Sequence, residues 1–182
     1  MTQIRRIFCF LSVQSVRSVS DSKMTTTQTT ITYRPAQASD EAAIKSLIRA
    51  VNINPIGLKW PRFLVAVDGN GRLIGCGQIK PHRDGSRELA SIAVQKAYRR
   101  QGIAGEIIQR LLANEQPPVW LTCMNKLVPF YKQFGFVEVK NGDGRSLPRY
   151  FRLARALFKP IQKLSHIPGY LAVMVWPNET QK

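Results

Sequence analysis

The stretch AVQKAYRRQGIAGEIIQRLL, residues 93–112, decides the fold because a strand end, a basic turn and an amphipathic helix follow one another within it. Residues 89–94 are largely apolar, which predicts a short buried strand. Apolar residues then recur at helical spacing, so we expect a helix from about Gly102 to Asn114. The turn between them, RRQGIA at 99–104, fits the pattern R-x-x-G-x-[GA].

This turn, which we call the phosphate loop (residues 99–104), favours the binding of a pyrophosphate. The first backbone N–H groups of a helix have no internal partner, and with the helix dipole they attract anions. Gly102 and Ala104 leave the backbone accessible, while Arg99 and Arg100 add positive charge. The alternative is a basic helix start in which Gly102 serves close packing. Neither G-x-x-x-x-G-K-[ST] nor G-x-G-x-x-G occurs, so a nucleotide-hydrolysing P-loop and a dinucleotide fold are not supported.

A second segment, WLTCMNKLVPFYKQFGFVEV at residues 120–139, predicts a strand, a short helix and another strand. Gly135 suits the left-handed position that ends a helix. Pro129 suits the first turn of that helix, where a missing N–H costs nothing.

Together the two segments resemble the GNAT superfamily of acyl-CoA-dependent N-acetyltransferases. The first is similar to that family's acetyl-CoA motif, R-x-x-G-x-[GA] after a strand ending in Ala93-Val94, and the second to its FY-x-x-x-GF segment, here residues 130–136. The resemblance covers most of 31–176. It implies an α/β (α+β) fold with a mixed, mostly antiparallel sheet flanked by helices. It also implies acetyl-CoA as co-substrate and direct transfer of acetyl to a primary amine, without a covalent enzyme intermediate.

The resemblance further implies which residues contact the cofactor. Backbone groups of Ile92 and Val94 would pair with the pantetheine amides, and the Val94 N–H would donate to the thioester carbonyl. Asn125 is another candidate CoA contact, with an Asn that caps its own loop as the equal alternative. The phosphate loop would hold the pyrophosphate through Arg99, Arg100, Gln101, Gly102, Ile103 and Ala104.

Two residues are candidates for proton transfer by the same resemblance. Tyr131 would act as general acid toward the departing CoA sulfur, and its alternative is an aromatic ring packed beside Phe130 and Phe134. Glu88 would act as general base. It lies six residues before Val94, so a period of two places both on one face of the strand. The alternative for Glu88 is an ion pair with a neighbouring cation, Arg87 or Arg83.

The composition of the chain limits the classes of partner and of bound metal that we expect. The net charge of +16 favours anionic partners such as the CoA phosphates, an acidic substrate or nucleic acid, and it argues against a polyamine acceptor. The three cysteines form no C-x-x-C pair, and we expect Cys76 and Cys123 in the core. His82 and His166 have no ligand-spaced partners, so we expect both in loops or at the surface and predict no metal site.

The N-terminal 29 residues differ from the rest, being rich in Ser, Thr and Arg and poor in acids. We expect a disordered extension before a single acetyltransferase domain at 30–178. The extension is interpreted as a mis-assigned start before Met24, with an organellar transit peptide or a weak secretory signal as alternatives. We therefore expect a cytoplasmic protein unless the segment directs import.

Elsewhere the pattern predicts one further unusual element, a helix at 148–164 inserted before the last strand. Its expected apolar face includes Phe151, Leu157 and Phe158, and Arg and Lys residues at 149–163 cover the remainder. This basic helix suggests an acidic partner or nucleic acid, although such a charge run is usually a solvated face. It also supports the rival hypothesis of a non-catalytic CoA-binding or RNA-associated module. The oligomeric state is left open between monomer and homodimer.

Overall fold

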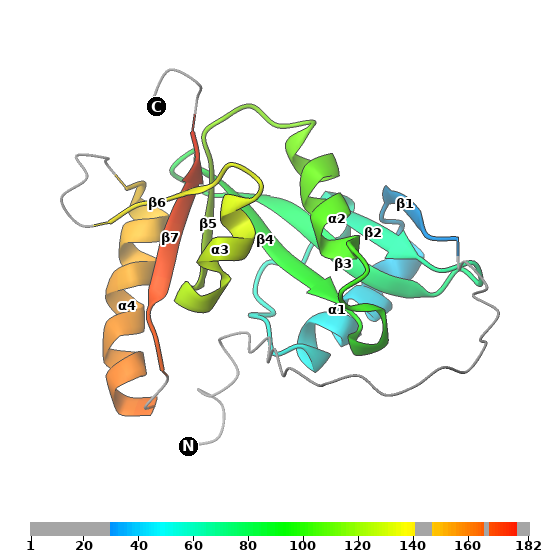
Figure 1. Ribbon diagram of the computed structural model, residues 1–182, viewed down its shortest axis with the longest axis horizontal. Helices are drawn as coiled ribbons and strands as arrows, with labels where there is room; N and C mark the ends of the chain where they lie inside the picture. Colours follow the sequence, from blue (N-terminus) through cyan, green and yellow to red (C-terminus); the bar gives the residue numbers. More distant parts are fainter. Residues whose placement is uncertain (1–29, 141–146, 166–167, 178–182) are drawn as a thin grey trace, which may run out of the picture.

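The computed structural model describes residues 30–140, 147–165 and 168–177 (Figure 1). The expected N-terminal extension at 1–29 and His166 lie outside the described residues. The strands are β1 Thr32–Pro35, β2 Phe63–Val67, β3 Leu73–Pro81, β4 Arg87–Val94, β5 Val119–Met124, β6 Val137–Glu138 and β7 Leu171–Trp176. The helices are α1 Glu41–Ala50, α2 Ile103–Leu112, α3 Val128–Lys132 and α4 Arg149–Ser165.

These strands form one seven-stranded sheet in the order β1-β2-β3-β4-β5-β7-β6. All neighbours in it are antiparallel except β4 and β5, which run parallel. A parallel pair needs a crossover connection, and α2 supplies it between β4 and β5. The expected mixed, mostly antiparallel sheet is therefore confirmed.

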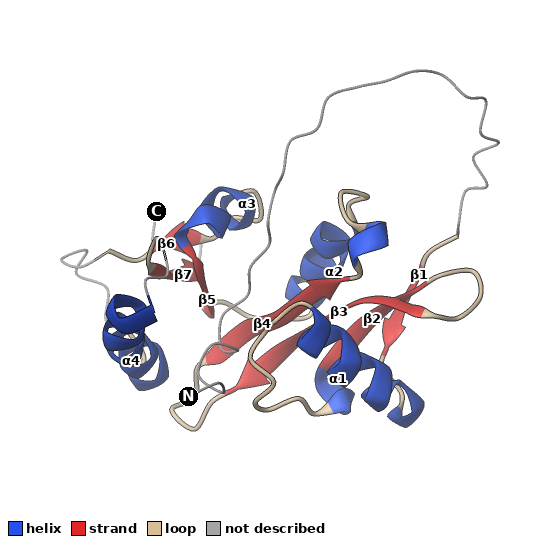
Figure 2. Cartoon of the chain, turned by 90° about the horizontal axis from the view of Figure 1, so that it is seen from below, coloured by secondary structure: helices blue, strands red, loops and turns tan. Residues whose placement is uncertain are grey.

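Helices cover both faces of the sheet. Figure 2 shows α1 and α4 on one face and α2 and α3 on the other. The core clusters agree, because Ile44 and Ile48 of α1 pack with Cys76, whereas Ile107 of α2 packs with Val94. Helix α2 lies close on β3: a Cβ added at Gly77 would be 2.7 Å from the Ile107 side chain. A glycine is needed there for this close approach.

Helix α4 is the insertion expected before the last strand, and its burial differs in part from the expectation. Phe151 and Phe158 are buried as expected, and Phe151 packs against Trp120 at a ring distance of 5.5 Å. Leu157 is 60% exposed, so its expected place in the apolar face is wrong. Arg155 is half-buried and donates to the Val139 carbonyl, so it does not belong to the solvated basic face. Helix α4 has apolar residues on several sides, and periodicity alone does not show which side packs against the sheet.

In the part of the chain that the structure describes, no helix has both the length and the hydropathy needed to span a membrane.

Candidate active site

The central feature of the site is the divergence of β4 and β5. Their ladder pairs only Arg87 with Val119 and Glu88 with Trp120 among the described residues, and beyond Glu88 the strands separate (Figure 2). On the opposite edge of β4, the Gln95 N–H donates to the Ile74 carbonyl of β3 at 2.8 Å. Because bonding alternates along an antiparallel pair, the backbone groups of Val94 point away from β3, toward β5.

A β-bulge in β4 changes which side chains share a face. Ser91 has φ +58°, and the β3–β4 register shifts by one residue between the Gln78–Ala90 and Cys76–Ala93 pairs. Leu89 and Val94 both pack on the α2 side of the sheet, so Glu88 faces the other side. The expectation that Glu88 and Val94 share a face is therefore wrong, because the bulge adds one residue to the period of two.

The phosphate loop lies at the end of β4, where α2 begins. Gly102 is the N-cap of α2 with φ +79°, and Arg100 also has a positive φ of 62°. A Cβ added at Gly102 would meet no described atom within 4 Å, so close packing against a neighbour does not explain the glycine at this position. Glycine is favoured here for its left-handed backbone. The space above the first turn of α2 remains open at this position.

The side chains of the loop fall into three groups. Arg99 is half-buried, and its Nε donates to the Val94 carbonyl at 3.2 Å, which links the loop to the diverging end of β4. Arg100 and Gln101 are exposed. Ile103 is buried in the α2 core and Ala104 packs beside it, so these two residues offer backbone rather than side chains to a ligand.

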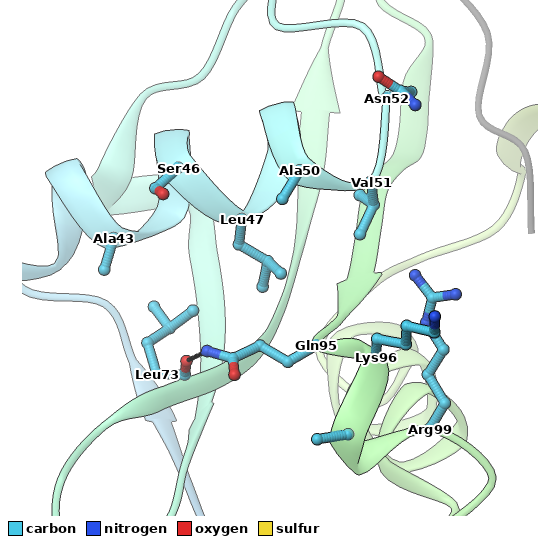
Figure 3. Close-up of a pocket in the computed structure, with 11 residues that line it drawn as sticks. Ala43, Ser46, Leu47, Ala50, Val51, Asn52, Leu73, Gln95, Lys96 and Arg99 are labelled. Atoms are coloured by element: carbon cyan, nitrogen blue, oxygen red, sulfur yellow. Dashed lines mark hydrogen bonds between the residues drawn. The ribbon is translucent and has the colours of Figure 1, made fainter.

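An open pocket of about 630 Å³ adjoins the loop on the α1 side of the sheet (Figure 3). Helix α1 forms one wall and the segment from Gln95 to Arg99 forms the other. The sequence did not indicate this pocket, because its α1 residues come from a different part of the chain. It is lined by Ala43, Ser46, Leu47, Ala50, Val51, Asn52, Leu73, Gln95, Lys96, Ala97 and Arg99.

Glu88 lies at the apex of the divergence, in a buried polar cluster. Its carboxylate is 2.9 Å from Nε2 of His82 and accepts a long hydrogen bond of 3.4 Å from Thr122 of β5. Arg87 instead pairs with Glu115, so the expected alternative of an Arg87–Glu88 ion pair is wrong. Alternation along the strand explains this, because consecutive side chains point to opposite faces.

His82 lies in the turn between β3 and β4, so the expected loop position is correct, but it is not at the surface: its side chain is only 8% exposed. The Tyr150 ring of α4 stacks on the imidazole at 3.5 Å, and Phe151 contacts it edge-on at 5.7 Å. The first turn of α4 is attached at the same place, since the Tyr150 N–H donates to Asp84 at 2.9 Å. His82 and Tyr150 are thus site residues that sequence reasoning missed.

Electrostatics in this cluster favour a protonated Tyr150 and a charged Asp84. Burial raises the pKa of Tyr150 to about 12, aided by the charge of Glu88 and by a hydrogen bond to it. Hydrogen bonds from the Ser86 hydroxyl and the Tyr150 N–H lower the pKa of Asp84 to about 2. The Tyr150 hydroxyl therefore stays protonated beside the Glu88 carboxylate.

Ile92 of β4 is partly buried against α2, and two further predicted site residues, Tyr131 and Asn125, lie on the β5 side. Tyr131 of α3 is half-buried and contacts Phe130 and Phe136 edge-on. Asn125 follows β5, and its Oδ1 accepts a 3.3 Å hydrogen bond from the Tyr170 N–H. This contact joins the residue after β5 to the residue before β7, 45 residues away in the chain, and is not a cap of its own loop. The roles of Tyr131 and Asn125 toward CoA stay predictions.

Cys76 and Cys123 are buried, as expected, and burial raises the pKa of each thiol to about 12. Among the residues that the structure describes, no three His, Cys, Asp or Glu side chains gather as a metal site.

Comparisons with known proteins agree with this geometry. Residues 59–138 match the family model of the acetyltransferase (GNAT) domain. Rv2747 from Mycobacterium tuberculosis, solved with CoA and NLQ, is 22% identical with a TM-score of 0.59, over 79% of this chain and 98% of that one. A GNAT-family acetyltransferase from Staphylococcus aureus Mu50 is 15% identical with a TM-score of 0.54, over 80% of this chain and 98% of that one.

N-acetylglutamate synthase from Neisseria gonorrhoeae, solved with coenzyme A and L-arginine, is 16% identical with a TM-score of 0.58. The match covers 80% of this chain but only 33% of that one. A search of curated protein sequences finds no significant match. Residues 59–138 thus match the acetyltransferase (GNAT) domain, and the solved neighbours show that the described chain has the fold of such acetyltransferases.

Proposed function

We propose that this protein transfers the acetyl group of acetyl-CoA directly to a primary amine, on a small molecule or on a protein N-terminus or lysine. The observation that carries the proposal is the arrangement along β4. The strand separates from β5 just beyond the buried Glu88, and the phosphate loop follows its far end with open space above Gly102. A thioester held along the strand would thus have an anion site at one end and a proton-accepting cluster at the other.

In this proposal the CoA pyrophosphate binds the first turn of α2, whose free N–H groups and dipole favour an anion. The exposed Arg100 adds positive charge beside it. Val94 directs its backbone toward β5, where its N–H stabilises the oxyanion that forms when the amine attacks the thioester carbonyl.

The proton balance needs one base and one acid. The cluster around Glu88 removes a proton from the ammonium of the acceptor, and the freed electron pair attacks the carbonyl carbon. As the C–S bond breaks, the Tyr131 hydroxyl donates a proton or a hydrogen bond to the departing thiolate. The attacking nitrogen loses its second proton as the amide forms, and this proton ends on the CoA sulfur, through Tyr131 or through water. Its half-buried position on α3, beside β5, is compatible with this role.

The acceptor is proposed to bind on the α1 and α4 face of β4, which Glu88 faces. Lys80 ties the segment 52–60 to this region by donating to the Ile56 carbonyl at 3.0 Å. The net charge of +16 favours an acceptor that carries an anionic group over a polyamine. The complexes of the neighbours with L-arginine or NLQ support placing amino acids first in a screen.

The proposal is tested by measuring CoA thiol release from acetyl-CoA with purified full-length protein. The panel holds amino acids, aminoglycosides, polyamines and peptides with free N-termini. We expect amine-dependent release with an anionic amine, which Tyr131→Phe lowers strongly. Tight acetyl-CoA binding without transfer to any amine would instead identify a non-catalytic CoA-binding module.

A further inference from the structure

The buried cluster at the apex of β4 and β5 contains a second proton-accepting group besides Glu88, and the inserted helix α4 holds it in place. We infer that His82 and Glu88 act as a dyad in which His82 Nδ1 receives the proton of the acceptor amine, Glu88 orients the imidazole, and Tyr150 of α4 clamps both. This inference rests on the proposed function and names the atom that accepts the proton in it.

Hydrogen bonding defines which nitrogen of His82 is basic. An ionised carboxylate only accepts hydrogen bonds, so the 2.9 Å contact with Glu88 requires the proton of neutral His82 to be on Nε2. The lone pair then resides on Nδ1. This is the logic of a carboxylate–histidine pair, in which the carboxylate selects the tautomer and stabilises the imidazolium that forms.

Glu88 is better suited to orienting the ring than to accepting the proton itself. Two donors contact its carboxylate, His82 at Oε2 and Thr122 at Oε1, so both oxygens are engaged. The Tyr150 hydroxyl also interacts with this carboxylate. Glu88 thereby fixes the orientation of the imidazole, as the carboxylate does in other carboxylate–histidine pairs.

Helix α4 completes the dyad. Tyr150 stacks on the imidazole with its ring inclined by only 19°, and its hydroxyl interacts with the Glu88 carboxylate. Asp84 fixes the start of α4 by accepting the Tyr150 N–H at 2.9 Å. The ring and the hydroxyl of one residue from the insertion therefore hold both members of the pair.

Other charged groups face the pair from the neighbouring elements. Lys80 of β3 is the cross-strand partner of Glu88, but its ammonium donates to the Ile56 carbonyl. Asp84, in the turn between β3 and β4, interacts electrostatically with His82. Arg87 on β4 is engaged by Glu115, and β5 contributes the uncharged Thr122.

The proton step balances within the proposed reaction. The N–H bond of the ammonium breaks, directly or through one water, and the Nδ1–H bond forms. The electron pair left on the amine attacks the thioester carbonyl. His82 becomes an imidazolium paired with Glu88 and returns its proton to solvent after the products leave.

The geometry of the dyad can be tested without any acceptor. The chain has two histidines, so a ¹⁵N–¹H spectrum of the imidazoles is assigned by comparison with His82→Gln. We expect the pure Nε2–H tautomer for neutral His82 in the wild type and a mixture of tautomers in Glu88→Gln. An Nδ1–H tautomer in the wild type overturns the dyad, whatever the enzymatic activity.

The catalytic role is tested with the acceptor that the amine screen identifies. His82→Gln retains an N–H donor for Glu88 but has no titrating nitrogen, so we expect kcat near pH 6.5 to fall by ~10²-fold. The loss should shrink to less than ~10-fold at a pH where the acceptor amine is already neutral, because the base is then dispensable. Full activity of His82→Gln at pH 6.5 overturns the role of His82 as base and shows that its side chain only packs in the cluster.

Tyr150→Phe retains the stack but removes the hydroxyl, and we expect a smaller loss in kcat with unchanged acetyl-CoA affinity. Tyr170→Phe is the matched control, because it removes a hydroxyl that bonds Glu138 at the far edge of the sheet and should leave kcat unchanged. Equal kcat values for Tyr150→Phe and Tyr170→Phe overturn the clamp. If no amine is acetylated, the proposed function fails while the tautomer experiment still decides the pairing.

Discussion

Replacing Gly102 by Asp tests the phosphate loop, because the new carboxylate would point into the space where the pyrophosphate is proposed to bind. The added Cβ meets no described atom within 4 Å, so the variant creates no steric conflict. The backbone has φ +79°, a left-handed conformation that costs a non-glycine residue roughly 1 kcal/mol, and Asn and Asp tolerate it best. Gly102→Asn is therefore the matched control, with the same shape and strain but no charge.

The expected loss of affinity follows from Coulomb's law. Two unit charges about 4 Å apart repel by about 1 kcal/mol in bulk water and about 4 kcal/mol at the effective dielectric near a protein surface. The loop is exposed, so we take about 2 kcal/mol, which corresponds to roughly 30-fold in Kd. The carboxylate also competes for the N–H groups of the first turn of α2, as an N-cap residue does, which acts in the same direction.

Isothermal titration calorimetry with acetyl-CoA measures the effect, and thermal denaturation confirms that each variant is folded. We expect Gly102→Asp to bind much more weakly than Gly102→Asn, with the difference shrinking at high salt as charges are screened. A folded Gly102→Asp protein with wild-type affinity would refute a phosphate site at this turn. Equal losses in the two variants would refute its electrostatic explanation.

Three further predictions address other parts of the molecule. Tyr131→Phe should lower kcat by ~10²-fold with little change in acetyl-CoA affinity, as measured by steady-state kinetics and calorimetry; an unchanged kcat would favour the packing role. The folded-state pKa of Asp84 is lowered from 3.8 to about 2, so its contribution to stability is present above pH 3.8 and is lost as the pH falls toward 2. In thermal melts Asp84→Asn should therefore be less stable than wild type at neutral pH but not near pH 2, and parallel pH curves would contradict a carboxylate held by the Ser86 and Tyr150 hydrogen bonds. The exposed side of α4 is tested with RNA as an acidic partner, in a gel-shift titration. If this side binds RNA, changing Arg149 and Arg152 to Gln should abolish the salt-sensitive binding and leave acetyl-CoA affinity intact. Unchanged RNA binding by this variant would exclude the exposed side of α4 as the binding surface.

The local elements of this protein follow from its sequence alone. The strand expected at 89–94 lies within β4 Arg87–Val94 and ends at the same residue, and α2 begins one residue after the expected Gly102. Such features depend on neighbours within one or two turns of chain. Apolar periodicity, a glycine with left-handed φ and a proline in a first helical turn are sufficient to define them. The proposed phosphate site belongs to this class, because it depends only on where a helix starts.

The tertiary structure decided which side chains meet. A single bulge at Ser91 reverses the face of every residue beyond it, and no residue-type preference in the stretch LASIAV marks that position. Asp84 and Tyr150 are 66 residues apart in the chain, and only the docking of α4 beside β5 brings them into contact and buries His82. A histidine without ligand-spaced neighbours resembles a surface residue in sequence, because burial and hydrogen bonding depend on elements that are distant along the chain. The candidate base cluster was therefore predicted only through Glu88, since its other members are assembled by contacts that periodicity does not encode.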